Sequence, residues 1–334
     1  MKLKRVFGVI AVLCFSALFC LSQTPAYRIS APYSHKNLTI YLIHGKNETS
    51  KTNILTLQEA MNMRILRVYE TTDVNELSVE NISKQFDVFI QSGDIVKGGQ
   101  QDRVLAVSII IAARSGRIKI DAFCVESGRW QKRGNEDAGQ FSSSNDRIVS
   151  KELKLAANVS RSQQEVWAKV SEAQDKLSAN VGGSVAAPVS RSSLQLSLEN
   201  GKVAATADEY VNKLSNLIEG KSDVIGYAFA VNGELNSADI YVSNALFKKL
   251  WPRMLKAAAV EAVAEQNGRM SAAPPAKPAA ISEFLSDADA GAAHERAVSG
   301  GTRIVTRDKK DSAVYEARDD KSKTVVHRAY VKKH

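Results

Sequence analysis

Two short loops carry the residue types best suited to chemistry in this chain. The first lies within SGDIVKGGQQDRVL (92–105), just before an apolar run, and supplies Gly98, Gly99, Gln101, Asp102 and Arg103. Adjacent glycines allow a tight turn whose N–H groups, together with an arginine fork, can bind an anion or a sugar. The same pattern is also compatible with a β-turn in which Asp102 and Arg103 form a structural ion pair.

The second loop is CVESGRW (124–130), in which Glu126 is followed by Arg129 and Trp130. Glu126 can pair with Arg103 or Arg129 and bury the ion pair beneath Trp130, where it would set geometry more than stability. Two carboxylates in different environments can also divide acid and base roles, with Asp102 as the partner. A structural pair, a ligand site and a catalytic pair therefore all stay open.

Other kinds of site have little support in the sequence. Cys124 lies in an apolar run without a nearby base, as a buried thiol does. The five histidines have no spacing typical of a zinc site, and no GxSxG, P-loop or GxGxxG motif is present. We therefore expect neither a metal nor a cofactor.

The N-terminus has the features of a secretory signal peptide. Met-Lys-Leu-Lys-Arg precedes an apolar run from Val6 to Leu21, which is shorter than a membrane-spanning helix. We expect cleavage after Ser22 and a secreted or periplasmic mature chain without a transmembrane segment. An uncleaved anchor and a lipoprotein attached through Cys20 are the alternatives. Cleavage would leave Cys124 as the only thiol, which excludes an intramolecular disulfide.

The formal net charge of +9 is concentrated at the two ends of the chain. Three cations precede the apolar run, and residues 301–334 carry ten Lys or Arg against five Asp or Glu. A nucleic-acid-binding protein usually has a basic face with stacking aromatic residues. We therefore expect no nucleic-acid partner, and a small molecule or an envelope component remains the unidentified partner.

The N-terminal half is predicted to be mainly strands. Alternating or continuous apolar residues indicate a short helix over 55–63 and strands over 37–43, 64–70, 77–81, 86–93, 104–115 and 118–126. The run 104–115 is the most apolar of the mature chain, so we place it at the centre of a sheet. Residues 131–150 are polar and are predicted to be irregular.

The C-terminal half alternates helices with strands. We predict a helix over 162–179, a helix over 205–220 capped by Thr206 and Glu209, a hairpin over 223–242 turning at Asn232-Gly233, and a helix over 244–267 kinked or divided at Pro252. A Pro/Ala linker over 271–280 precedes three short strands, which we expect to dock on the main body. The predicted fold is α+β, with a largely antiparallel sheet first, helices and a hairpin next, and a short β tail. Its predicted regions are the signal peptide (1–22), the main domain (37–266), a linker and variable segment (267–300) and the basic tail (301–334).

Five segments in this order resemble the ARG-and-Rhodanese-Phosphatase-superfamily-associated protein domain, a family of unknown function. They are GGQQDR (98–103), CVESGRW (124–130), QQEVW (163–167), GYAFAVNGELNSADIYVSNALFKKLW (226–251) and VVHRAY (325–330). The resemblance covers residues 38–266 and, more loosely, the tail. It matches the residues of both loops, together with Gly128, and adds His327 to the candidate ligand-binding residues. The family's name implies a link to ADP-ribosylglycohydrolases and phosphatases, and thus to ADP-ribose or NAD-derived metabolites.

Two functions follow from these observations. The first is an exported ligand-binding or scaffolding protein without catalysis, because no catalytic constellation is evident. The second is an enzyme acting on an ADP-ribose-, ribose- or phosphate-bearing small molecule. The signal peptide and the Pro/Ala linker depart from the family pattern, and export is at odds with a cytosolic NAD-type role.

Overall fold

A computed structural model describes residues 27–48, 53–71, 73–147, 150–266, 274–298 and 301–333. The predicted signal peptide and its cleavage site after Ser22 lie outside the described residues. Within the described ranges, no helix combines the length and the apolar character that a membrane crossing requires. The fold is α+β, as predicted.

The largest element is a nine-stranded antiparallel sheet, here called the central sheet. Its strands follow the order β1-β3-β13-β14-β18-β17-β16-β15, with β2 also paired to β3. Their bounds are β1 (Arg28–Ile29), β2 (Tyr33–His35), β3 (Leu38–His44), β13 (Val224–Val231), β14 (Glu234–Tyr241), β15 (Ala293–Val298), β16 (Thr302–Asp308), β17 (Ser312–Asp319) and β18 (Val325–Lys332).

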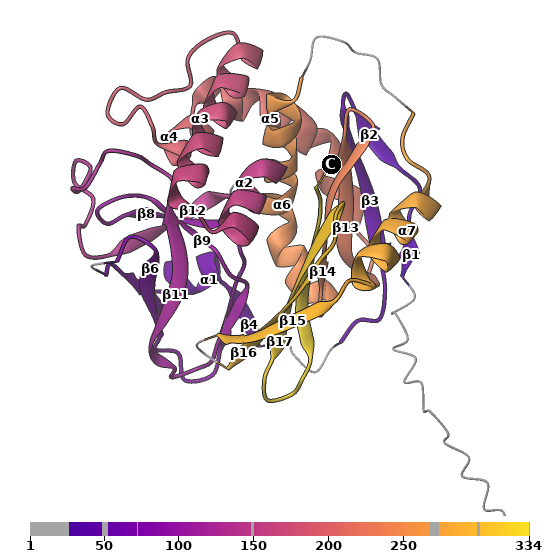
Figure 1. The fold of residues 1–334 in the computed structure, drawn as a ribbon, viewed down its shortest axis with the longest axis horizontal. Helices are drawn as coiled ribbons and strands as arrows, with labels where there is room; N and C mark the ends of the chain where they lie inside the picture. Colours follow the sequence, from indigo (N-terminus) through magenta and orange to yellow (C-terminus); the bar gives the residue numbers. More distant parts are fainter. Residues whose placement is uncertain are drawn as a thin grey trace, which may run out of the picture.

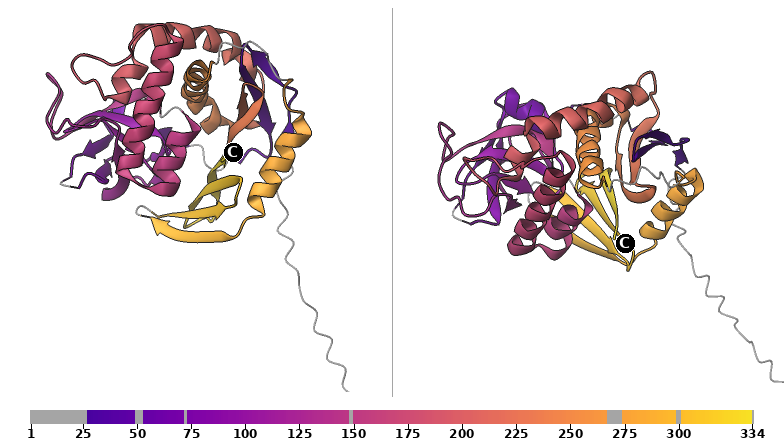
Figure 2. Two further views of the ribbon diagram at one scale, coloured as in Figure 1. Left: turned by 45° about the horizontal axis from the view of Figure 1, so that its top comes forward. Right: turned by 90° about the horizontal axis from the view of Figure 1, so that it is seen from above.

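The two-residue period of a strand explains how this sheet is covered on both faces. Leu38, Ile40 and Leu42 of β3 join the core beneath α6, whereas Tyr41 and Ile43 join the core beneath α7. Two further views show α7 on the side of the sheet away from α6 (Figure 2). Both faces are therefore apolar, and β3 reads as a continuous apolar run.

A second layer of strands packs on the other side of α6 (Figure 1). It contains a six-stranded sheet, β12-β8-β9-β11-β6-β5, and a three-stranded sheet, β10-β7-β4, in which β4 and β7 are parallel. Their bounds are β4 (Ile54–Thr56), β5 (Leu66–Tyr69), β6 (Glu76–Asn81), β7 (Asp87–Ile90), β8 (Asp94–Gly98), β9 (Arg103–Leu105), β10 (Ile109–Ile111), β11 (Gly116–Cys124) and β12 (Phe141–Arg147).

Helices connect and cover the two layers. Their bounds are α1 (Leu57–Asn62), α2 (Lys151–Leu155), which continues as a π turn (Ala156–Ser160), α3 (Gln163–Asn180), α4 (Leu194–Leu198), α5 (Gly201–Leu214), followed by a 3-10 turn (Ser215–Ile218), α6 (Asn244–Ala264) and α7 (Pro278–Asp289). The hairpin is confirmed: Asn232 and Gly233 both have positive φ angles, 54° and 85°, and join β13 to β14 in a two-residue turn.

Two predictions in the N-terminal half are wrong. The apolar run 104–115 is not one strand, because it bends at Ala106–Ser108 and gives β9 to the six-stranded sheet and β10 to the three-stranded one. The polar segment 131–150 is not wholly irregular, because β12 pairs with β8 within it. Pairing partners distant in sequence decide both outcomes.

Two predictions in the C-terminal half also need correction, and the alternatives at Pro252 are reduced to one. Helix α5 begins after Asn200, whose side chain caps it, so Thr206 lies inside the helix and donates to the Lys202 carbonyl. Helix α6 continues through Pro252, so it is not divided there, and the alternative of a kink stays a prediction. The predicted linker over 271–280 is cut short because α7 begins at Pro278.

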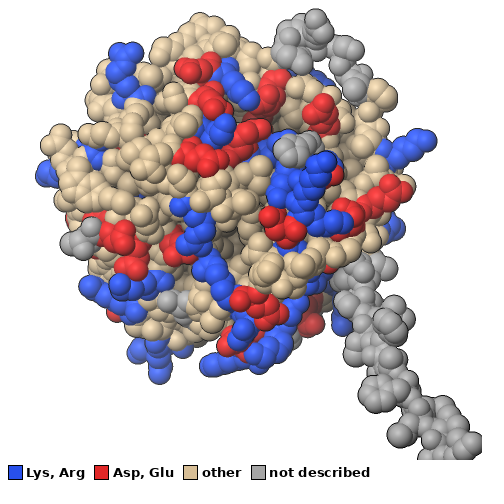
Figure 3. Space-filling view, in the orientation of Figure 1, with Lys and Arg blue, Asp and Glu red and all other residues tan. Residues whose placement is uncertain are grey.

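The basic tail adds three strands, β16, β17 and β18, to the central sheet, and the segment just before the tail adds β15. Strand β18 pairs with β14, and β17, β16 and β15 follow it outward. The tail thereby supplies side chains to the interior of the molecule. Acidic and basic side chains are interspersed on the face seen in Figure 3.

Candidate functional site

The structure brings the two predicted loops together around Asp102. Both carboxylate oxygens of Asp102 accept hydrogen bonds from Arg133, at 3.0 and 3.2 Å, and Arg129 lies 3.6 Å away. The backbone N–H of Gly98 donates to the same carboxylate at 3.0 Å. Asp102 therefore pairs with arginines of the following loop and not with its neighbour Arg103.

Glu126 completes the cluster from the second loop. Its carboxylate lies 2.6 Å from the Arg129 guanidinium and accepts hydrogen bonds from the Ser190 hydroxyl and, at 3.3 Å, from the backbone N–H of Asp102. The Gln101 side chain donates to the Glu126 carbonyl at 2.7 Å. The predicted Glu126–Arg129 pair thus forms and ties the two loops to each other.

Arg103 belongs to a neighbouring arrangement. Among the described residues it pairs with Glu70, at 3.0 Å, and contacts the Cys124 thiol, so the alternative pair with Glu126 is not made. Trp130 stacks over the Arg103 guanidinium at 5.5 Å and is half exposed. Burial, opposed in part by Arg103, raises the pKa of Cys124 to about 11.

The paired glycines form the tight turn expected of them. Gly98 and Gly99 have φ angles of 107° and 57°, in the region that favours glycine. A Cβ atom on Gly99 would lie 2.4 Å from the Phe141 ring and 2.8 Å from the Glu70 carboxylate. This close approach fixes the turn against β12 and leaves no space for a ligand beside Gly99.

The two carboxylates of the cluster have different protonation tendencies. Burial raises the pKa of Asp102 although Arg133 opposes the shift. Burial acts the same way on Glu126, but hydrogen bonds from Arg129 and Ser190 hold the pKa of Glu126 below its ordinary value. Neither carboxylate has exposed surface.

We call the group formed by Asp102, Glu126, Arg129 and Arg133 the loop cluster. Its carboxylates are bonded to side chains and backbone of the same chain, and the cavity described next is lined by none of its members. Buried, internally bonded ions of this kind hold backbone segments in place. The geometry therefore favours the structural alternative for both predicted loops.

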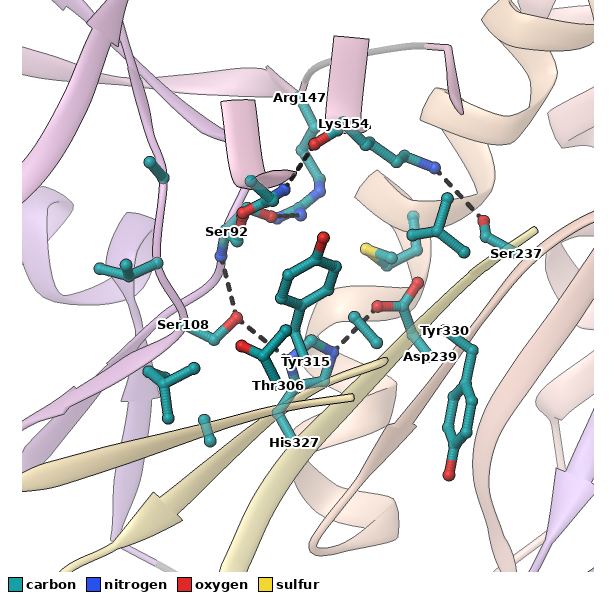
Figure 4. Close-up of a pocket in the computed structure, with 18 of the residues that line it drawn as sticks. Ser92, Ser108, Arg147, Lys154, Ser237, Asp239, Thr306, Tyr315, His327 and Tyr330 are labelled. Carbon is teal, nitrogen blue, oxygen red and sulfur yellow. Dashed lines mark hydrogen bonds and ion pairs between the residues drawn. The ribbon is translucent and has the colours of Figure 1, made fainter. Parts of the chain in front are cut away.

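His327 lies elsewhere, in a cavity between the central sheet and the second layer. The cavity has a volume of about 280 Å³. Strands β14 and β18 supply Asp239 and His327, the bend between β9 and β10 supplies Ser108, and helix α2 supplies Lys154 (Figure 4). Its walls thus come from both halves of the chain.

A hydrogen-bonded row of three side chains lies in this cavity. His327 Nε2 is 2.9 Å from Asp239 Oδ1, and His327 Nδ1 is 3.1 Å from Ser108 Oγ (Figure 4). Gln91 also donates to Asp239 at 3.2 Å, and Tyr241 donates to Gln91. Burial opposes ionisation of Asp239, but the hydrogen bond and charge of His327 keep the pKa of Asp239 below its ordinary value. When the imidazole is neutral, an ionised Asp239 places its proton on Nε2, and Nδ1 then accepts the Ser108 hydroxyl proton.

Basic side chains line the rest of the cavity. Arg147 shares Asp94 with Arg253, which lies just outside the cavity wall. In the same way, Arg161 and Arg296 share Asp121, at 2.9 and 3.3 Å. Two carboxylates therefore face four guanidinium groups.

Lys154 adds a further positive charge to the cavity. Its ammonium group lies 3.8 Å from Glu261 and 3.4 Å from the Ser237 hydroxyl, both long contacts. Glu261 accepts hydrogen bonds from Asn236 and the Lys151 backbone through Oε1, whereas its Oε2 is the atom nearest Lys154. The cavity is thus more positive than negative, and Lys154 is weakly held.

The sequence of the chain matches the model of one known family. The family model of the ARG and Rhodanese-Phosphatase-superfamily-associated Protein domain matches residues 26–331. The chain belongs to this family. The match includes the linker and the tail, so it extends well beyond 38–266, and no curated protein and no solved structure matches the chain.

Sequence reasoning missed most residues of the cavity in this family member. Asp239 lies within an apolar strand and Ser108 within the apolar run 104–115, so both look like core residues, and Lys154 and Arg147 lie in a polar segment without a motif. The spacing of His327 from Ser108, 219 residues, gives no local signal. Within the described part of the chain, no group of three or more His, Cys, Asp or Glu side chains is arranged to hold a metal ion.

Proposed function

We propose that this protein binds a small anionic molecule in the cavity lined by Lys154 and His327. The observation that carries the proposal is the charge of the lining: Arg147, Lys154, Arg161 and Arg296 line the cavity, whereas Asp239 is the carboxylate among its lining residues. The hydrogen bond and ion pair of Lys154 are both long. Charge-assisted hydrogen bonds from such groups favour phosphate and carboxylate. Hydroxyl and imidazole groups beside them suit a ribose or another polyol.

The ligand class that we propose is therefore a phosphate- or ribose-bearing small molecule. ADP-ribose and related nucleotides belong to this class, and the family's name associates it with proteins of ADP-ribose metabolism. The loop cluster is assigned a supporting role, because it is buried and bonded internally. Of the residues predicted as candidate ligand contacts, His327 is the one that lines this cavity.

A ligand screen by thermal unfolding tests the proposal. The panel contains ADP-ribose, nucleotides, ribose phosphates, free sugars and inorganic phosphate. A ligand at 100 times its Kd stabilises the folded protein by about 2.7 kcal/mol, which is a clear shift in Tm. No shift with any member of the panel would remove the proposal and leave scaffolding as the remaining role.

A matched pair of lysine variants locates the site. Lys154→Met removes the weakly held cation from the cavity, and Lys151→Met makes the same change on the same helix outside it. We expect Lys154→Met to weaken binding of the panel's best ligand about tenfold or more, which corresponds to one charge-assisted hydrogen bond. Equal affinities of the two variants in titration calorimetry would place the ligand elsewhere.

We also propose that the protein works outside the cytosol. The support is the basic start and apolar run of residues 1–22. Intact-mass measurement of protein isolated from its native host, expected to begin at Gln23, tests this. Recovery of chains that still begin at Met1, in the cytosolic fraction, would contradict export.

A further inference from the structure

We infer that Ser108 is a nucleophile activated by His327 and Asp239, which makes the cavity the active site of a hydrolase. The inference rests on the proposed function for its substrate class, an ester that carries an anionic group. It goes further because binding alone requires no ordered proton acceptor on a serine.

The order of contacts is that of a serine nucleophile, its base and an orienting carboxylate. Asp239 accepts the Nε2 proton of His327 at 2.9 Å, and the opposite ring nitrogen faces Ser108 Oγ at 3.1 Å. The ring nitrogens have exchanged roles relative to the common serine hydrolase arrangement, but each group keeps its function. Such arrangements are recognised by geometry and not by order in the sequence.

The Ser108 hydroxyl oxygen keeps one lone pair that is free to attack a substrate. The hydroxyl donates its proton to His327 and accepts one hydrogen bond, from the backbone N–H of Ser92 at 3.1 Å. A hydroxyl oxygen has two lone pairs, so one remains for a substrate carbon. All three side chains of the row line the cavity (Figure 4).

Three separate parts of the fold converge to build the row. Ser108 ends the bend that divides the apolar run 104–115, and this bend turns its side chain toward β18. Asp239 and His327 are near neighbours on the paired strands β14 and β18, where Ala329 lies opposite Asp239 and His327 opposite Tyr241. The imidazole is held between Tyr241, stacked at 4.8 Å, and Phe89. The base is therefore fixed in orientation on both sides.

The reaction that fits these groups is hydrolysis of a carboxylic ester. Ser108 Oγ bonds to the ester carbonyl carbon while its proton moves to His327 Nδ1. The carbon–oxygen bond to the leaving alcohol then breaks, and the imidazolium returns the proton to that alcohol. Water repeats the sequence on the acyl-serine, releasing the carboxylic acid and restoring Ser108. Lys154 and the neighbouring guanidinium groups would hold the anionic part of the substrate.

The test is covalent labelling of the full chain with a fluorophosphonate probe, followed by peptide mapping, together with hydrolysis of para-nitrophenyl acetate. We expect the label on Ser108 and measurable hydrolysis in the wild type, with neither in Ser108→Ala. Asp239→Asn should slow both roughly 10²- to 10⁴-fold, because it disturbs the tautomer of the base. Ser282→Ala, on helix α7 and outside the cavity, should match the wild type.

Circular dichroism shows whether each variant is folded, and Ser108→Ala changes so little volume that it serves if Asp239→Asn does not fold. Absence of both label and hydrolysis in the folded wild type, or equal rates in Ser108→Ala, would overturn the inference. Binding of the anionic panel is measured separately on Ser108→Ala. Retained binding without labelling of the wild type would leave the proposed function standing alone, whereas labelling of Ser108 without any anion binding would overturn the proposed function and not the nucleophile.

Discussion

Replacing Glu126 by glutamine tests whether the loop cluster is structural. The two side chains have the same shape, but glutamine is neutral and turns one acceptor oxygen into a donor. At this position the carboxylate has no exposed surface and accepts from Ser190 and the Asp102 backbone, with Arg129 at 2.6 Å. The variant leaves Arg129 buried without its charged partner. The new N–H group of the glutamine also faces groups that are themselves hydrogen-bond donors, so it gains no acceptor.

The expected loss of stability is large relative to the total. Removing one partner of a buried ion pair costs about 3–5 kcal/mol, against a total stability of about 5–15 kcal/mol for a typical domain. With a urea dependence of about 3 kcal/mol per molar, a loss of about 4 kcal/mol lowers the unfolding midpoint by roughly 1.3 M.

Urea unfolding followed by circular dichroism measures this shift. Glu283→Gln, an exposed position on helix α7, is the matched control and should change the free energy of unfolding by less than about 0.5 kcal/mol. If Glu126→Gln also stays within about 1 kcal/mol of the wild type, the carboxylate does not hold the loops together. Its burial would then have to serve a ligand, and the structural interpretation of the loop cluster would be wrong.

The pH dependence of the stability of the same variant gives a second test of the Glu126 ion pair. The folded protein holds the pKa of Glu126 below its ordinary value, against the effect of burial. A depressed pKa contributes stability above the unfolded value, about 4.3, and this contribution disappears as pH falls through the folded pKa. The stability difference between wild type and Glu126→Gln should therefore be full at pH 7 and shrink below about pH 4. A difference that stays constant down to pH 3 would contradict this assignment.

Two further predictions concern the turn and the thiol. Gly99→Ala should lower the free energy of unfolding by about 1–3 kcal/mol more than Gly116→Ala. Both glycines have positive φ, but of the two only Gly99 has atoms within 3 Å of the added Cβ. Equal losses of stability in urea unfolding would show that the close approach to Phe141 is not made. With Cys14 and Cys20 replaced by serine, the native protein should not react with a thiol reagent at pH 8, because burial raises the pKa of Cys124 to about 11, and unfolding in urea should release one equivalent. Rapid reaction of the folded protein would contradict the burial of this thiol.

Sequence patterns correctly predicted the elements whose structure depends on interactions between residues close together in the chain. The Asn232-Gly233 turn, the helix over 162–179 and the strand over 37–43 all form, because turn chemistry and side-chain periodicity act within a few residues. The division of 104–115 could not be read in this way. An apolar run shows that a strand is buried but not which neighbour pairs with it, and β9 and β10 pair in different sheets.

Of the ion pairs in the loop cluster, the sequence predicted Glu126–Arg129 but not Asp102–Arg133. Glu126 and Arg129 are three residues apart, so their pairing depends on one turn of backbone. Arg133 reaches Asp102 across 31 residues, through a segment that carries no motif. Charged residues without regular spacing pair according to how the chain folds around them.

The sequence alone was therefore enough to predict the kinds of element in each half, the hairpin and the family resemblance, because these depend on short stretches of chain. The cavity depends on strand pairing over long separations. Asp239 and His327 are 88 residues apart, and Ser108 and His327 are 219 apart, yet sheet register and one bend bring them within hydrogen-bond distance. Contacts of this kind arise from the burial of whole strands and helices. The sequence predicted that the tail docks on the main body, but only the tertiary structure shows that it forms a wall of the proposed site.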